Sequence, residues 1–598
     1  MNGFWNRMLW RIDRWLATGR VARSREGYCR YSFDNHILVL GGGDMLEDVL
    51  EAIAARSEWA EREVVVLSSR PAAEVRKRLE TRLNPDAAQL SLTLYYGSRT
   101  LETELRSCQV DKASLIFIIG EDGENGHDAM NVHCWKTVRS LRGRASQVAQ
   151  CYLELQSSAS IGLFHMLPQE AHTTVETTIV NRYESIVGQL LVGDTPQTAP
   201  YTLDRGLITA DADRYVHLVV VGMTKMGYAF ATTAAQLCHF PNFDETSARP
   251  LRTKITFLDP SADVKMNQFK GAYPHLFALS HSRYMVNDTG WMQGRPDERY
   301  GDFLDVEWQF LKGTTNDEWV RTMLTLAAKD GRQVLSIAFC TDSADDNFAQ
   351  SIHLPSQLYP MPETEGAEGI NVENAPSCPN IYVYQPYSGA LLSTAAEEVL
   401  RLHNLIPFGE RVGDYDPLQT RATAVAKRVN YLYQKETSGK QFESMPTDAA
   451  LLDDLWQQLS LAEKMSNLHT AHSVYTHLRS LAMGTAAVLQ PLEDPERLEA
   501  LARVEHARWN LAKLLVGYEA MTTAERESLN TALASPDVTT RQEALSHTNR
   551  CANQLFLMKD LAPYHTLPEE AKTDIRTLSR HLPLAALPYI SSIESDAY

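Results

Sequence analysis

The sequence YVHLVVVGMTKMGYAF, residues 215–230, decides how the rest of the chain is organised. Its run of valine and leucine ends in glycine, which predicts a strand buried on both faces, as in a parallel sheet. The residues from Gly222 onward predict a tight turn and the start of a helix, whose first backbone N–H groups have no partner within the helix. Such a helix N-terminus is a place where phosphate binds.

This turn carries two of the three glycines of the dinucleotide-binding fingerprint, Gly222 and Gly227, with Thr224 at the middle position. The strand predicted at 255–259 ends in Asp259, where this fold places a carboxylate that binds ribose. Asp259 follows Gly222 by 37 residues, which implies an inserted loop at 238–253. One interpretation is a nucleotide site. The other is that the two glycines serve only to pack the helix closely on the strand.

Length and composition indicate a soluble globular protein of about three or four domains. The 598 residues carry a net charge of −18, so a nucleic-acid backbone would be repelled over most of the surface, and we predict no nucleic-acid partner. Eight cysteines are scattered without a Cys-x-x-Cys pair, so we predict neither a metal site nor a disulfide framework. With no bilayer-length apolar run and no secretory signal, a cytoplasmic location is expected.

Residues 4–16 predict a basic amphipathic helix. Seven arginines stand against two acidic residues in 1–30, and three tryptophans (Trp5, Trp10, Trp15) fall within the helix. Indole rings and arginines together suit a membrane interface, which would make residues 1–19 a peripheral anchor on the inner face of the membrane. The alternative is a helix docked on the protein itself or on a partner subunit.

A second strand–turn–helix precedes the first one in the chain, at 36–54. It carries Gly41 and Gly43 of the fingerprint but Leu46 at the third position, and its following strand, 64–70, ends in Ser-Ser-Arg rather than in a carboxylate. Arg70 at that place would favour a phosphate over a bare ribose. A solvated arginine on a surface turn is the alternative.

The two halves of the α/β region repeat the same order of elements, which indicates a tandem duplication. Strands predicted at 92–96 and 113–119 in the first half correspond to 308–312 and 334–340 in the second, and each half closes with a further strand, at 147–154 and 380–385. Gly41 and Asn125 are 84 residues apart, and Gly222 and Asn347 are 125 apart, so the second copy has gained loops such as 259–302.

The acidic loops 121–125 and 341–347 present oxygen ligands for a cation or are simply solvated. A long excursion is predicted at 355–379.

These features together resemble the regulator-of-potassium-conductance (RCK, TrkA N-terminal) domain, present twice. The matching features are the glycine turns, third strands ending in Gly-Ser-Arg-Thr and Gly-Thr-Thr-Asn, and fourth strands followed by acidic loops with asparagine. The resemblance implies nucleotide-binding Rossmann folds that sense a ligand and move a partner, usually a channel gate, without catalysing a reaction. Residues 11–19 also resemble the segment before the first membrane span of Castor/Pollux channels, although no span follows here.

The C-terminal part is predicted to be helical and holds a dense polar constellation at 504–511. Helical spacing places Glu505, Arg508 and Trp509 on one face, where a carboxylate, a guanidinium and an indole would suit a base or ribose. The sequence from Glu505 through Tyr518, together with 561–583, resembles the RyR (ryanodine receptor) domain. An internal salt bridge with a buried indole is the alternative.

We therefore expect two Rossmann-like doubly wound parallel-sheet domains followed by an all-α RyR-like domain. The expected ranges are 1–33 for the N-terminal helix and linker, 34–200 and 201–410 for the α/β domains, 411–450 for a helical linker and 451–598 for the last domain. The expected function is a non-catalytic sensor of an adenine nucleotide such as NAD(H) or NADP(H), or of a nucleotide-derived messenger. We expect it to be homo-oligomeric and to act on a partner or membrane protein, in ion transport or in bacterial antiviral defence. An NAD(P)-dependent or nucleotide-hydrolysing enzyme is the alternative, although no proton-handling residue follows either turn.

Overall fold

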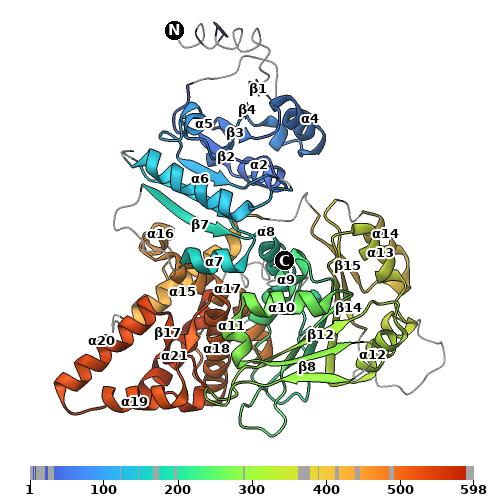
Figure 1. Cartoon of the computed structure of the whole chain (residues 1–598), viewed down its shortest axis with the longest axis vertical. Helices are drawn as coiled ribbons and strands as arrows, with labels where there is room; N and C mark the ends of the chain where they lie inside the picture. The colour runs from blue at the N-terminus through green and yellow to red at the C-terminus, as the bar shows by residue number, and fades with distance from the viewer. Residues whose placement is uncertain are drawn as a thin grey trace. The chain divides into compact units, whose positions relative to one another are not determined.

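The computed structural model shows two compact units (Figure 1), Met1–Ser185 with Arg411–Gln419, and Ile186–Glu410 with Thr420–Tyr598. Apart from residues 5, 7, 8 and 21–23, the N-terminal 31 residues lie outside the described part, and so does most of the predicted helix at 4–16. Residues 361–377 of the predicted excursion also lie outside it. The described residues are 5, 7–8, 21–23, 32–121, 123–143, 145, 147–165, 174–193, 198–286, 290–360, 378–387, 390–410, 416–437, 445–446, 448–483 and 490–586.

The first unit is built on a seven-stranded sheet with the order β1-β4-β3-β2-β5-β6-β7. All neighbours pair in parallel except β1, which is antiparallel to β4. The strands are β1 (Val21–Arg23), β2 (Ile37–Leu40), β3 (Val64–Ser68), β4 (Leu92–Tyr96), β5 (Leu115–Ile118), β6 (Ala149–Glu154) and β7 (Val175–Val180). The helices are α2 (Leu46–Ala54), α3 (Ser57–Ala60), α4 (Ala72–Arg82), α5 (Glu102–Ser107), α6 (His127–Arg142) and α7 (Ser158–His165), and α8 (Arg182–Leu191) begins in this unit and continues into the second.

The second unit contains an eight-stranded sheet with the order β11-β10-β12-β9-β8-β13-β14-β15. Only β11 is antiparallel to its neighbour. The strands are β8 (Tyr215–Val221), β9 (Thr253–Asp259), β10 (His281–Val286), β11 (Trp291–Gly294), β12 (Val306–Lys312), β13 (Gln333–Phe339), β14 (Asn380–Tyr384) and β15 (Leu405–Phe408). The helices of this α/β domain are α9 (Lys225–Leu237), α10 (Ala262–Ala272), α11 (Pro274–Leu279), α12 (Glu318–Lys329), α13 (Ala344–Ile352) and α14 (Ala390–Glu398).

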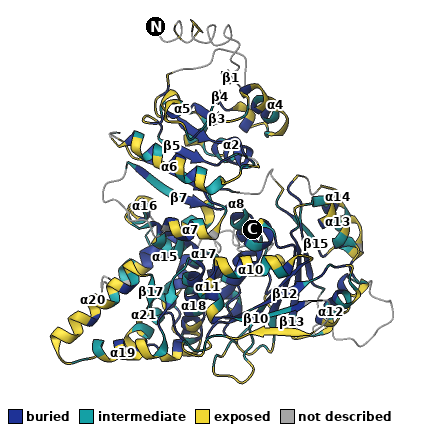
Figure 2. Ribbon diagram, in the orientation of Figure 1, coloured by how far each residue is buried: buried dark blue, intermediate teal, exposed yellow. Residues whose placement is uncertain are grey.

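Six strands in each sheet follow the doubly wound order 3-2-1-4-5-6, so the predicted fold class is confirmed. The central strands are valine- and leucine-rich and buried on both faces, as helices on two sides of a parallel sheet require (Figure 2). The sequence-based account missed the sixth strand of each sheet, β7 and β15. It was also wrong about 259–302, which forms α10, α11, β10 and β11 rather than only loops.

A matching hydrogen bond identifies the true equivalent positions of the duplication. In the second copy the Asn347 side chain on α13 donates to the carbonyl of Tyr384, the last residue of β14. In the first copy the Asn131 side chain on α6 donates to the carbonyl of Glu154, the last residue of β6. Asn131, and not the predicted Asn125, therefore corresponds to Asn347.

The rest of the second unit is helical. It contains α15 (Thr420–Thr437), α16 (Ala449–Gln457), α17 (Leu461–Ser480), α18 (Pro495–Leu515), α19 (Thr523–Leu533), α20 (Val538–Gln554) and α21 (Glu569–His581), with a short pair β16 (Glu519–Ala520) and β17 (Leu557–Met558). Helix α15 falls in the predicted linker but packs Val425, Val429 and Leu432 into one core with α17. Within the described residues, no helix is long and apolar enough to cross a membrane.

A buried ion pair joins the helical domain to the second α/β domain. Arg479, near the end of α17, donates through Nη2 to Oδ1 of Asp204 at 2.9 Å and through Nε to Oδ2 at 3.2 Å. The same guanidinium donates to the carbonyls of Gly193, at 2.9 Å, and Val192. Burial raises the pKa of Asp204, but the charge and hydrogen bonds of Arg479 more than offset this, so the pKa is lowered overall.

Replacing Arg479 by Met should destabilise the second unit by about 3–5 kcal/mol, because Asp204 would remain as a buried, unpaired carboxylate. Urea unfolding followed by circular dichroism measures the change. Arg497→Met, which alters an exposed arginine on α18, is the matched control and should change stability by less than about 0.5 kcal/mol. Equal effects of the two substitutions would contradict a role for this ion pair in holding the domains together.

Candidate functional site

The second glycine turn is closely packed against its own domain. Gly222 has a φ of +101°, and a Cβ there would lie 3.0 Å from the backbone nitrogen of Thr341. A Cβ on Gly227 would lie 2.0 Å from the carbonyl oxygen of Gly222. Both positions therefore require glycine for packing, whether or not a ligand binds.

The polar groups of this turn are engaged by the protein. The Thr224 hydroxyl caps α9 by accepting from the Gly227 N–H at 3.1 Å, and it donates to the Cys340 carbonyl at 2.5 Å. The buried Asp259 carboxylate accepts from the backbone N–H of Met223 and from the Lys265 ammonium, each at 2.8 Å. It also accepts from the N–H of Ser261. The groups predicted to hold pyrophosphate and ribose thus have protein partners in place of a ligand.

The first glycine turn is occupied in a similar way. Arg78 on α4 donates to the carbonyls of Gly42, at 2.7 Å, and Gly43, at 3.0 Å, and pairs with Glu47 in the first turn of α2. A Cβ on Gly41 would lie 2.1 Å from the Gly120 carbonyl oxygen. A carboxylate in the first turn of α2 opposes phosphate binding at that helix N-terminus.

Beside this turn, the strand that precedes Arg70 ends against a second carboxylate. Glu121 accepts from the Ser69 N–H at 2.7 Å and from the Ser68 hydroxyl at 3.2 Å. The backbone N–H of Arg70 donates to the Ser68 hydroxyl. The place predicted for a phosphate is therefore lined by Glu121, and the nucleotide role of Gly41, Gly43 and Arg70 stays a prediction.

A histidine between two carboxylates stands at the same edge of the first sheet. His127 Nδ1 lies 3.0 Å from Asp128 Oδ1, and Nε2 lies 3.4 Å from Glu154 Oε2. Burial alone would lower the pKa of His127, but its hydrogen bonds to the two carboxylates and their charges raise it to about 9. An imidazolium therefore ties the start of α6 to the end of β6 at neutral pH.

His127→Gln should destabilise the first unit at pH 6 by about 1–3 kcal/mol, because the charge-assisted contacts to Asp128 and Glu154 are lost. Since the folded pKa is raised, this contribution is fully present below the unfolded value near 6.5 and disappears as the pH rises through about 9. Urea unfolding at pH 6 and pH 10 measures it. The control is His133→Gln, on an exposed position of the same helix. A pH-independent difference between wild type and His127→Gln would contradict the assignment.

The predicted C-terminal constellation separates into two groups. Glu505 and Arg508 are buried and pair with each other, at 2.9 and 2.5 Å, against the Thr470 hydroxyl on α17. Trp509 and Tyr518 instead flank Lys513, whose ammonium lies 5.8 and 5.0 Å from their ring centroids. Burial, followed by the charge of Arg508, lowers the pKa of Lys513 to about 8. Glu505 and Arg508 form the internal salt bridge of the alternative interpretation, and the nucleotide role of Glu505, Arg508, Trp509 and Tyr518 stays a prediction.

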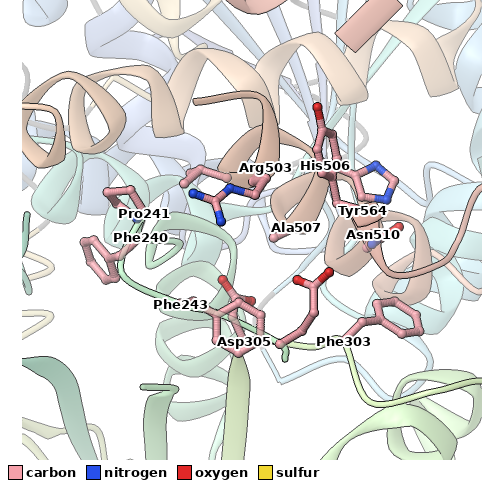
Figure 3. Close-up of a pocket in the computed structure, with 12 residues that line it drawn as sticks. Phe240, Pro241, Phe243, Phe303, Asp305, Arg503, His506, Ala507, Asn510 and Tyr564 are labelled. Carbon is pink, nitrogen blue, oxygen red and sulfur yellow. The ribbon is translucent and has the colours of Figure 1, made fainter. Parts of the chain in front are cut away.

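A cleft lies between the second α/β domain and the helical domain (Figure 3). The space between its walls, counting the part that is open to solvent, is about 370 Å³. Helix α18 forms one wall, and the loops before β9 and β12 form the other. The lining residues are Phe240, Pro241, Phe243, Glu245, Phe303, Asp305, Arg503, Val504, His506, Ala507, Asn510 and Tyr564.

Polar groups surround the aromatic rings of the cleft. Asp305 is buried and lies 2.8 Å from Nδ1 of His239, and Glu245 lies 2.6 Å from Nδ1 of His565. Arg503 is exposed and makes no hydrogen bond or salt bridge to the described residues, although it acts electrostatically on Asp244. The cleft thus offers apolar ring faces, carboxylate acceptors and one cation at its rim.

Of the cleft residues, only Val504, His506, Ala507 and Asn510 belong to a pattern noted in the sequence, the polar constellation at 504–511. Phe240, Phe303 and Asp305 lie in loops without a motif, and they meet α18 only because the chain folds back on itself. Within the described ranges, no group of three or more His, Cys, Asp or Glu residues is placed to hold a metal ion.

No protein-family model and no curated protein matches the chain. Solved structures similar to it include the crystal structure of GsuK bound to ADP, with 14% identity and a TM-score of 0.28, over 62% of this chain and 66% of that one. They also include the human SLO3 gating ring, with 11% identity and a TM-score of 0.35, over 64% of this chain and 81% of that one. The chain thus spans slightly less than two thirds of GsuK. The two doubly wound sheets that the RCK resemblance implied are present, and the RyR resemblance stays a prediction.

Proposed function

We propose that this chain is a non-catalytic sensor that binds a nucleotide-type ligand in the cleft between its second α/β domain and its helical domain. The observation that carries the proposal is the meeting of three phenylalanines, two carboxylates and an exposed arginine in a cleft made by two domains. The glycine turns are weaker candidates, because Thr224, Asp259, Glu121 and Arg78 already satisfy their polar groups.

A binding role suits the chemistry of the cleft better than catalysis does. The His506 Nε2 donates to the Ala562 carbonyl at 2.9 Å, and burial lowers the pKa of this histidine, which leaves it neutral. Asp305 is held by His239, and Glu245 by His565. Among the lining residues, none places a nucleophile beside a free base, which covalent catalysis requires. Measured turnover decides between this proposal and the alternative of an NAD(P)-dependent or nucleotide-hydrolysing enzyme.

Ligand binding at this place has a physical route to the rest of the unit. Burial is the main cause that lowers the pKa of His477 on α17 to about 3, and His239, which contacts Asp305, lies close enough to contribute to the lowering. The Arg479–Asp204 pair holds this same end of α17 against the second α/β domain. A ligand that binds both walls stabilises one relative position of the two domains, which is how a sensor shifts a conformational equilibrium.

The partners in this proposal are those expected from the sequence. A homo-oligomer, an associated membrane protein, and a membrane contact through residues 1–19 on the cytoplasmic face remain proposals, as do roles in ion transport and in antiviral defence. NAD(H), NADP(H) and other adenine nucleotides are the first candidates for the ligand.

Replacing Ala507 by Phe should weaken nucleotide binding by more than about tenfold, because the added ring fills the cleft from α18. Isothermal titration with NAD, NADP, ADP-ribose, ATP and cyclic nucleotides measures the affinity, and chromatography of the same samples measures turnover. Ala507→Ser, which keeps the side chain small, should bind as the wild type does. Unchanged binding by Ala507→Phe would move the site elsewhere, and steady conversion of any ligand would contradict a non-catalytic role.

Arg503→Ala should weaken the binding of phosphate-bearing ligands by about tenfold while leaving the corresponding nucleosides unaffected, because the guanidinium at the rim is the cation available to a phosphate. Titrations of ATP and adenosine against the same variant provide the comparison. Arg497→Ala, at an exposed position on the same helix, controls for the change in net charge. An equal loss for ATP and adenosine would contradict a phosphate contact at Arg503.

A further inference from the structure

One carbonyl in the cleft fixes the orientation of two side chains. The Ala562 carbonyl oxygen accepts from Nε2 of His506 at 2.9 Å and from Nδ2 of Asn510 at 3.0 Å. Two donors on one carbonyl leave no room for the opposite amide orientation, which would set two oxygens against each other. The Asn510 amide oxygen therefore faces away from Ala562.

That oxygen is a buried acceptor in need of a donor. Asn510 is 2% exposed and lines the cleft, and its Oδ1 has no hydrogen-bond partner among the residues described. A buried polar atom left without a partner costs about 1–3 kcal/mol. A donor on a ligand would recover this cost.

The neighbouring groups inside the cleft are acceptors too. The Asp305 carboxylate uses both oxygens toward Nδ1 of His239, at 3.0 and 2.8 Å, and each oxygen retains a further lone pair. The Glu245 carboxylate also lines the cleft and is paired with His565. Two carboxylates repel a phosphate from the interior, so a phosphate group belongs at the rim beside the exposed Arg503.

The remaining walls favour a flat, apolar ligand surface. Phe240, Phe243 and Phe303 approach the cleft from the α/β domain, opposite α18 (Figure 3). Aromatic rings in a cleft of this kind pack against planar heterocycles. The interior thus combines ring faces with hydrogen-bond acceptors, and the rim supplies positive charge.

We infer that the cleft selects nucleobases bearing an exocyclic amino group, which donates to Asn510 Oδ1 and the Asp305 carboxylate while the phosphate end points toward Arg503. This inference rests on the proposed function. It identifies the base, rather than the phosphates, as the part of the ligand that the protein recognises. A carbonyl in place of the amino group would set acceptor against acceptor, and specific sites discriminate strongly against such a change.

Titration of the wild-type chain with nucleosides tests this directly. Adenosine should bind at least about tenfold more tightly than inosine, and cytidine more tightly than uridine, since in each pair a carbonyl replaces the amino group. Equal affinities within the pairs would overturn the inference while leaving the proposed function intact. If Ala507→Phe does not weaken the binding of any nucleoside, or if none of the nucleosides and nucleotides binds, the proposed function and this inference both fail.

Asn510→Ala assigns the discrimination to its residue. The variant keeps the His506 contact to Ala562 but removes the acceptor, so the ratio of adenosine to inosine affinity should fall toward one. A ratio that stays at the wild-type value would overturn the role of Asn510. The wild-type nucleoside series stands as a separate test if this variant does not fold.

Discussion

The contact between Arg479 and Asp204 sets the geometry on which the second unit depends. A guanidinium that pairs with a buried carboxylate and also donates to two backbone carbonyls has little freedom to move, because each of its bonds has a defined direction. It fixes α17 against the second α/β domain. Helix α18 packs on α17 and on α9, and is thereby held opposite the loops before β9 and β12. The cleft exists because this ion pair holds the helical domain in a fixed position against the second α/β domain.

At the carboxyl ends of both sheets, the polar groups around the glycine turn bond within the protein, through different residues in each copy. In the second sheet, Thr224 caps the N-terminus of α9, where a phosphate would otherwise bind. The Asp259 carboxylate accepts hydrogen bonds from a backbone N–H and from a lysine. In the first sheet Glu47 and Arg78 close the turn, and Glu121 fills the position beside Ser68. Satisfying these groups internally stabilises the apo fold. It also means that a nucleotide bound there would have to replace protein hydrogen bonds, which favours the cleft as the place of binding.

Much of the fold could be predicted from the sequence, because strands such as 216–221 and 64–67 are apolar runs ending in turn residues. The strands β7 and β15 were not predicted, because three consecutive polar residues interrupt the apolar pattern of Val175–Val180, and Leu405–Phe408 has only four residues, one of them proline. The cleft could not be predicted. Phe240, Asp305 and Arg503 are far apart in sequence and carry no shared pattern, so only their tertiary proximity reveals them. Glu505 and Arg508 were predicted to share a helical face, which is correct, but periodicity says nothing about whether that face meets a ligand or another helix.

The duplicated domains show which parts of the ancestral unit are structural. The bonds from Asn131 to Glu154 and from Asn347 to Tyr384 are the same interaction in both copies, tying the helix after the fourth strand to the end of the fifth. The chemistry around that bond has diverged. The first copy surrounds it with charge, from His127, Asp128 and Arg99, whereas the second uses the neutral Thr341. A shared hydrogen bond within such different electrostatics indicates that the bond maintains the fold. In the proposed site, ligand specificity therefore comes from α18 together with the loops before β9 and β12, and not from this shared bond.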